Sequence, residues 1–274
     1  MRKSVRVQLV AVAILGVLAA ALWYAIARED RGGKLTVSFL AVGKGEAILI
    51  DMPSGRQVLI DGGPDGSVLR QLGALMAPWD RSLDLVIATS ANKGDVSGLI
   101  DVLQRYRVDT VLQTSVEDSS VPWYSFEKGA AASGTSMRTA RRGQIIDLGT
   151  GAQLEVLFPD RNLLASGAGE GCVVTRLVYG KTAFLFPCDA TTGVQNYLAA
   201  LDGSTLRADV LTVSASQAKT FSPILLGYVS PKYVVYSGTC AASSTLPAFS
   251  NAETLDTCGG TVSFVSDGKI VSGH

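Results

Sequence analysis

The stretch LTVSFLAVGKGEAILIDMPSGRQVLIDGGP, Leu35–Pro64, decides the fold. Apolar and polar residues alternate from Lys34 to Leu40, which is typical of a half-buried strand. Two short apolar runs follow, Ala47–Ile50 and Val58–Ile60, and Pro53-Ser54-Gly55 between them predicts a turn. We therefore expect one strand followed by a hairpin at the start of a sheet.

The remaining chain alternates strand and helix patterns. Apolar residues recur at helical spacing from Val96 to Tyr106, between the apolar runs Leu85–Ala88 and Thr110–Leu112. By the same criteria, we predict further helices at Val68–Met76, Thr192–Leu201 and Phe221–Tyr228. Further strands are predicted at Ile145–Ile146, Leu154–Phe158, Val173–Tyr179, Thr182–Phe186, Val210–Val213, Tyr233–Tyr236, Thr261–Val265 and Lys269–Val271. We expect surface loops at Ser115–Ser120 and Ala131–Ser136. This alternation predicts an α/β domain.

The first thirty residues have the pattern of a membrane segment. Arg2, Lys3 and Arg6 precede 19 uncharged residues, Leu9–Ala27, and about 20 apolar residues are needed to span a bilayer. Because positive charge stays on the cytoplasmic side, we predict a cytoplasmic tip and anchor over residues 1–30 and an extracytoplasmic domain over residues 31–274 of a single-pass membrane protein. The alternative is a cleaved signal peptide, since Ala25-Ile26-Ala27 fits a cleavage site.

Charge and histidine content exclude several functions. Residues 1–27 hold three basic and no acidic residues, which leaves 21 basic against 24 acidic residues in residues 28–274 and no basic stripe for tracking phosphates. Direct nucleic-acid binding is therefore disfavoured. The single histidine, His274, is the last residue, so a metal site with two histidines from this chain is excluded.

The four cysteines all follow the membrane segment. An even number in an oxidising compartment predicts disulfides, and four cysteines allow three pairings. We favour Cys172–Cys188, which brackets the hairpin around Gly180-Lys181 with a register one residue off, and Cys240–Cys258.

Three stretches resemble a known family: Leu35–Pro64, LDLVIATSANKGDVSGLIDVLQRYRVDTVL (Leu83–Leu112) and VVTRLVYGKTAFLFPCDA (Val173–Ala190). They look like the metallo-β-lactamase-like extracytoplasmic domain of the competence protein ComEC, and the segment Val42–Ala47 follows that family's V-G-Q-G-D-A. The resemblance implies a four-layer αββα sandwich with a metal site at the strand ends, and a link to DNA uptake at the cell envelope.

The departures from the family fall on the metal ligands. The family motif T-H-x-H-x-D-H reads Thr89–Asp95, with Ser90, Asn92 and Asp95 at the histidine positions and Gly94 at the aspartate position. The bridging aspartate matches Asp189, whereas the later G-H-H-G-S reads Ser214–Ala218 and Y-G-H-P reads Tyr236–Thr239. Seryl hydroxyls and an amide are poor replacements for imidazole at a zinc site.

The sequence therefore predicts an emptied pocket and a pseudoenzyme that binds or scaffolds, with no cofactor. The pocket residues implied by the resemblance are Asp61, Ser90, Asn92, Asp95, Asp189, Ala215 and Ser216. The alternative is a phosphodiesterase or nuclease with a weakly bound divalent metal on Asp95 and Asp189.

Two further interpretations concern residues outside this pocket. Glu46 is expected to be a solvated turn charge beside Lys44, and Trp123 and Tyr124 are expected to pack under a loop. The predicted partners are the membrane, through residues 9–27, and an envelope or DNA-uptake protein.

Overall fold

Two sheets form the body of the computed structural model, which describes residues 2–29, 32–116, 118–160, 171–238 and 251–273. Within these residues, the first sheet has eight strands in the order β15-β14-β1-β2-β3-β4-β5-β6. Their bounds are β1 Leu35–Phe39, β2 Ile48–Asp51, β3 Gln57–Ile60, β4 Ser82–Ala88, β5 Arg107–Gln113, β6 Ser136–Thr139, β14 Val262–Ser266 and β15 Val271–Gly273. The expected hairpin is confirmed, because β2 and β3 pair antiparallel.

The second sheet has seven strands within the same residues, in the order β13-β12-β11-β10-β9-β8-β7. Their bounds are β7 Ile145–Gly149, β8 Ala152–Phe158, β9 Val174–Tyr179, β10 Thr182–Phe186, β11 Val210–Ser214, β12 Tyr233–Ser237 and β13 Glu253–Asp256. Strands β10 to β13 run parallel, so their carboxyl ends lie at one edge of the sheet.

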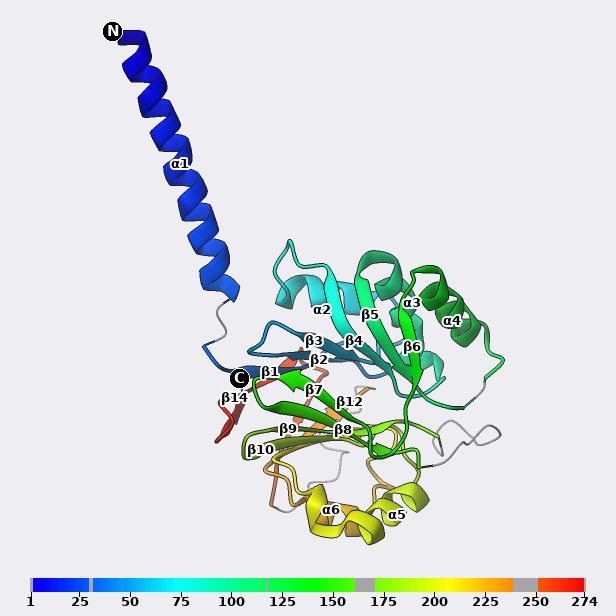
Figure 1. The fold of residues 1–274 in the computed structure, drawn as a ribbon. Coiled ribbons are helices and arrows are strands. Elements are labelled where there is room, and N and C mark those ends of the chain that lie inside the picture. Colours follow the sequence, from blue (N-terminus) through cyan, green and yellow to red (C-terminus); the bar gives the residue numbers. More distant parts are fainter. Residues whose placement is uncertain (1, 30–31, 117, 161–170, 239–250, 274) are drawn as a thin grey trace.

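Helices cover the outer face of each sheet, and the two inner faces pack together (Figure 1). The first sheet is covered by α2 Ser67–Leu75, α3 Lys93–Arg105 and α4 Val121–Ala132, and the second by α5 Thr192–Asp202 and α6 Pro223–Val229. Phe39, Phe184 and Phe264 fill the layer between the sheets. The predicted α/β sandwich with four layers is therefore present.

Three elements differ from the sequence-based expectations. The stretch Val121–Ala132 is helix α4, to most of which the sequence analysis assigned no element, and the expected loop Ala131–Ser136 contributes the end of α4 and the start of strand β6. Trp123 is buried in α4, whereas Tyr124 on the same helix is exposed, so only Trp123 packs as expected. Strand β13 has no counterpart among the predicted strands.

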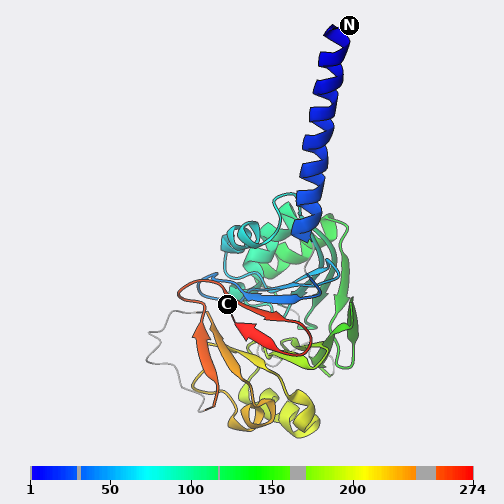
Figure 2. The same cartoon turned by 90° about the vertical axis from the view of Figure 1, so that its left-hand side faces the viewer.

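The N-terminal residues form a single helix, α1, Arg2–Glu29, which stands away from the sandwich in both views (Figures 1 and 2). Its described apolar side chains are exposed: Leu9, Val10, Val12, Ile14, Leu15, Val17, Leu18 and Trp23. Within the described part of the chain, no helix has both the length and the apolarity to cross a membrane. Membrane attachment through residues 1–30 stays a prediction.

Candidate functional site

A small cavity of about 190 Å³ lies where loops from both sheets meet. Strand β4 ends at Ala88, β11 at Ser214 and β12 at Ser237, and the loop between β1 and β2 reaches the same place. In open α/β sheets, ligand sites form at the carboxyl ends of the strands. The lining residues are Lys44, Gly45, Glu46, Thr89, Asn92, Gly94, Asp95, Asp189, Ser214, Ser216, Ser237 and Gly238.

Four of the seven predicted pocket residues line this cavity: Asn92, Asp95, Asp189 and Ser216. The other three lie beside it. Asp61 and Ser90 are buried against its wall, and the backbone N–H of Ala215 donates to the carbonyl of Ser237.

Asp61 joins the ends of strands β3 and β4. Its two carboxyl oxygens accept hydrogen bonds from the Thr89 backbone N–H at 2.8 Å and from the Thr89 hydroxyl at 2.6 Å. Burial raises the pKa of Asp61 well above its usual range, and the charge of Asp95 adds to this effect. Asp61 therefore has the structural role of a buried turn aspartate.

Asp95 takes the place of the last histidine in the family motif. It lies in the first turn of α3, and its Oδ2 accepts a hydrogen bond from the Ser90 hydroxyl at 2.6 Å. The Ser90 oxygen in turn accepts from the backbone N–H of Asn92. Burial raises the pKa of Asp95 to about 7, and the nearby charge of Asp189 also raises it. Serine and aspartate at two former histidine positions thus bond to each other.

Glu46 is a cavity residue that the sequence analysis missed. The expectation of a solvated turn charge is wrong, because the loop between β1 and β2 turns Glu46 inward, where its Oε1 accepts a hydrogen bond from Ser237 at 3.2 Å. Burial raises the pKa of Glu46 to about 8, with further contributions from the charges of Asp189 and Asp95. The signal available in the sequence was its place in the V-G-Q-G-D-A segment, where the family has an acid.

Asp189 follows β10 and faces the cavity from the second sheet. Burial raises its pKa, and a hydrogen bond from the Ser214 side chain lowers it. The Ser214 and Ser216 hydroxyls are themselves 2.8 Å apart. Within the described cavity, Asp189 is thus joined to hydroxyl groups of its own chain.

Close backbone contact fixes the loop that carries Glu46. Gly45 has φ of +146°, and a Cβ built there would lie 1.9 Å from the carbonyl oxygen of Gly94. Only glycine allows this approach. The contact holds Glu46 and Asp95 on opposite walls of one cavity.

The donor set does not fit the zinc-type centre that the resemblance implies. Residues 1–273 contain no histidine, and the described residues include no group of three histidine, cysteine, aspartate or glutamate side chains arranged to hold an ion. Instead, each carboxyl of the cavity accepts a hydrogen bond from the hydroxyl group of a serine. Zinc requires several nitrogen or sulfur ligands around one point.

A disulfide lies next to the cavity. Cys172 and Cys188 are bonded, as predicted, with Cα atoms 6.3 Å apart. Thr175 pairs with Phe186 across the hairpin, which leaves the two cysteines one residue out of register, and Cys188 adopts φ of +48°. Asp189 follows the bridge directly. The predicted Cys240–Cys258 pair includes Cys240, which lies outside the described residues.

Comparison with known proteins identifies the fold. No family model and no curated protein sequence matches the chain. Among solved structures, the metallo-β-lactamase fold protein YhfI from Bacillus subtilis is similar with a TM-score of 0.55 and 12% identity, over 85% of this chain and 99% of that one. A mutant of the CmlA β-hydroxylase matches with a TM-score of 0.50 and 12% identity, over 81% of this chain and 52% of the longer protein. Identity at this level shows the fold alone, and the chain has the metallo-β-lactamase fold.

Proposed function

We propose that this chain is a catalytically silent ComEC-like protein that serves as a binding or scaffold module. One observation carries the proposal. Each carboxyl in or beside the cavity shares a hydrogen bond with a serine or threonine of the chain: Asp61 with Thr89, Asp95 with Ser90, Glu46 with Ser237, and Asp189 with Ser214.

The chemistry of these groups supports this interpretation. A hydrolase of this fold needs a bound metal that lowers the pKa of water toward about 7. A carboxyl whose pKa is near or above 7 is protonated over part of the neutral range and then donates a hydrogen bond instead of holding a cation. The cavity therefore presents hydroxyl and carboxyl groups suited to hydrogen bonding with a small polar ligand.

The N-terminal helix supports a place for the protein at the cell membrane. The exposed apolar side chains of α1, together with Arg2, Lys3 and Arg6 before them, favour an anchor with the domain outside the cytoplasm. The Cys172–Cys188 bridge agrees with an oxidising compartment.

A role in DNA uptake rests on the family resemblance, and we expect it to operate through a protein partner. The cavity carries Glu46, Asp95 and Asp189, and an acidic cavity repels phosphates. Titration of the full chain with single-stranded DNA at two salt concentrations tests direct contact. Binding that weakens steeply with salt would establish a DNA-binding protein and contradict the proposal in this respect.

Metal content is the decisive measurement. The full chain in detergent is incubated with Zn²⁺, Mn²⁺, Mg²⁺ or Ca²⁺ and desalted, and bound metal is quantified by elemental mass spectrometry. We expect far less than one ion per chain. A stoichiometric ion that disappears in Asp189→Ala but persists in Asp118→Ala, which removes an exposed carboxylate, would overturn the proposal.

That outcome would instead favour the alternative, a phosphodiesterase or nuclease with an oxygen-ligand metal. The observation in its favour is that three carboxyls face one small cavity, where the charges of Asp189 and Asp95 raise the pKa of Glu46. Ca²⁺ and Mg²⁺ bind such oxygen ligands, but only after the carboxyls leave their hydroxyl partners. Hydrolysis of a chromogenic phosphodiester by the metal-loaded chain, lost in Asp95→Asn, tests this alternative.

A further inference from the structure

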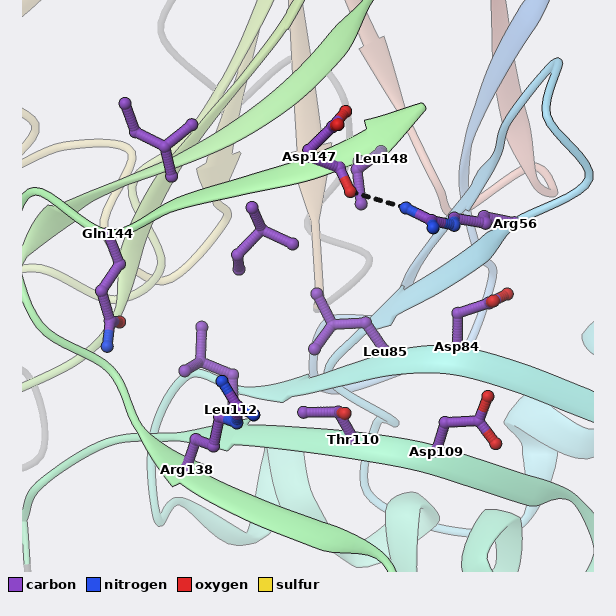
Figure 3. A pocket seen from close by; sticks show the side chains of 12 residues that line it. Arg56, Asp84, Leu85, Asp109, Thr110, Leu112, Arg138, Gln144, Asp147 and Leu148 are labelled. Atoms are coloured by element: carbon purple, nitrogen blue, oxygen red, sulfur yellow. Dashed lines mark hydrogen bonds between the residues drawn. The ribbon is translucent and has the colours of Figure 1, made fainter. Parts of the chain in front are cut away.

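A second and larger cavity, of about 690 Å³, lies at the side of the sandwich (Figure 3). It shares no residue with the acidic cavity. Strands β4, β5 and β6 of the first sheet form one wall, and β7 of the second sheet forms the other. Because β6 and β7 are the terminal strands of their sheets, the two sheets leave this edge open. Pockets for small ligands have volumes of about 300–1,000 Å³.

The middle of this cavity is apolar. Leu85, Leu112 and Leu148 belong to the packed layer between the sheets, and each contributes to the lining. Ile146 lies beside them, and Ile145 on the same strand is 61% exposed. The three leucines are buried in the domain, so the apolar surface that a ligand can remove from water, and thereby stabilise the complex, is that of Ile145 and Ile146.

The cationic end of the cavity is Arg138 on β6. Its guanidinium makes no hydrogen bond or ion pair with any other residue that the structure describes. Arg56, the other arginine of the lining, is already engaged, because it donates to the backbone carbonyl of Asp147 at 2.7 Å and ties β3 to β7. Arg138 is therefore available to bind a carboxylate in a bidentate manner.

The anionic end of the cavity is formed by Asp84 and Asp109. They occupy matching positions on β4 and β5, between the register pairs Leu83–Val108 and Leu85–Thr110. Asp84 accepts a hydrogen bond from the Gln57 backbone through Oδ2 only, and Asp109 contacts Arg107 at 3.6 Å in an exposed pair. Exposed pairs of this kind contribute little energy. Both carboxylates therefore retain capacity to accept bonds from a cation.

The spacing between the two ends defines the length of the ligand. Arg138 is in register with Leu112, and Asp109 precedes Leu112 by three residues on β5. At a rise of about 3.3 Å per residue, the opposite charges are on the order of 10 Å apart along the strand. Figure 3 shows Arg138 at one end of the floor and Asp84 and Asp109 at the other, with Leu112, Thr110 and Leu85 between them.

We propose that this cavity binds a short peptide of about three residues with free termini, because an extended chain advances about 3.3 Å per residue. The peptide carboxylate pairs with Arg138, its ammonium group lies between Asp84 and Asp109, and its apolar side chains cover Ile145 and Ile146. This site is independent of the acidic cavity and of the function proposed for it.

Calorimetric titration of the full chain in detergent tests the proposal. The probe is the tripeptide Ala-Leu-Ala with free termini, compared with its N-acetylated form, its C-amidated form and decanoate. We expect saturable binding of the free tripeptide, weakened about tenfold or more by blocking either end, since hydrogen bonds to charged groups contribute about 1.5–3 kcal/mol.

Variants assign the two ends of the peptide. Arg138→Gln should weaken binding of the free peptide by about tenfold but leave binding of the C-amidated form unchanged. Asp109→Asn should likewise weaken binding of the free peptide by about tenfold but leave binding of the N-acetylated form unchanged. Arg105→Gln, which removes an exposed arginine at the end of α3, is the matched control and should have no effect. Both test residues are exposed, so an unchanged unfolding temperature verifies that the fold is intact.

Three outcomes would overturn the proposal. The first is no binding of the free tripeptide, and the second is equal binding of all three peptide forms. The third is Arg138-dependent binding of decanoate without binding of the tripeptide, which would assign the cavity to amphipathic anions.

Discussion

Glu46 and Asp95 are two acids of the small cavity whose pKa values, about 8 and about 7, lie far above those of free carboxyls. A raised pKa means that the folded chain holds protons which the unfolded chain has already released above about pH 4. The folded state is therefore favoured at low pH, and this contribution is lost as the pH rises through 7 and 8. We expect the free energy of unfolding to fall between about pH 5 and about pH 8.5.

Glu46→Gln tests this pH dependence at a single residue. The amide resembles the protonated acid, so the variant should be more stable than the native chain at about pH 8.5, by about 1–3 kcal/mol, and should show a flatter pH profile. Glu253→Gln, at an exposed position in β13, is the matched control and should leave the profile unchanged. The measurement is urea unfolding at both pH values. A Glu46→Gln profile as steep as the native one would show that Glu46 does not carry the effect.

The cavity residues differ in how far the sequence predicted them. Asp95 and Asp189 were predicted because they stand at or beside ligand positions in recognisable motifs. Glu46 was not, because a glutamate that directly follows Gly45 in a short loop has no local pattern that distinguishes a side chain in solvent from one turned into a cavity. Its burial depends on Gly45 lying against Gly94, a contact between residues 49 positions apart that only the folded chain creates.

At the scale of elements, one close contact joins the Asp61–Gly63 turn to helix α3. A Cβ built on Gly98 would lie 1.9 Å from the carbonyl oxygen of Gly62. Gly98→Ala should therefore push α3 away from β3 and lower the free energy of unfolding by about 2–4 kcal/mol. Gly73→Ala is the matched control in α2, where nothing lies within 4 Å of the built Cβ, and it should stabilise by about 0.5–1 kcal/mol. Equal effects of the two substitutions on chemical denaturation would contradict the argument.

The β9–β10 hairpin depends on the Cys172–Cys188 bridge that spans it. The bridge closes a sequence separation of 16 residues, so its loss should reduce the free energy of unfolding by about 3 kcal/mol in the chain-entropy model. The variant carrying both Cys172→Ala and Cys188→Ala is compared with the native chain by thermal unfolding. Unfolding temperatures that agree within error would show that hairpin packing alone holds the two strands.

Elements with a strong apolar period were predicted well, and those without one were missed. Helix α4 begins with Val121-Pro122, and the sequence analysis assigned no element to most of this stretch. In the structure Pro122 lies in the first turn, where its missing N–H has no cost, and the Ser120 hydroxyl accepts from the Trp123 N–H. Strand β13 is a polar edge strand with two exposed residues, so it shows no alternation.

At the scale of the whole molecule, the sandwich offers two cavities with different chemistry. The acidic cavity is closed by hydrogen bonds within the chain, whereas the lateral cavity keeps one arginine and two aspartates in reach of a ligand. The apolar layers beneath both are continuous with the cores of the domain. We infer that any binding function belongs to surfaces formed by strand ends and sheet edges.

We predict that helix α1 anchors the whole molecule in a membrane. With Leu9–Ala27 inserted in a bilayer, the full chain should remain in the membrane pellet after a carbonate wash, and protease added to intact cells should digest the domain. Leu15→Arg places a charge at the middle of the helix, which costs about 2.5–3.5 kcal/mol on insertion, so part of the chain should move to the soluble fraction. Leu201→Arg alters an exposed leucine on α5 and should leave the distribution unchanged. A native chain that the wash releases completely would contradict the anchor, and the apolar face of α1 would then have to be covered by protein.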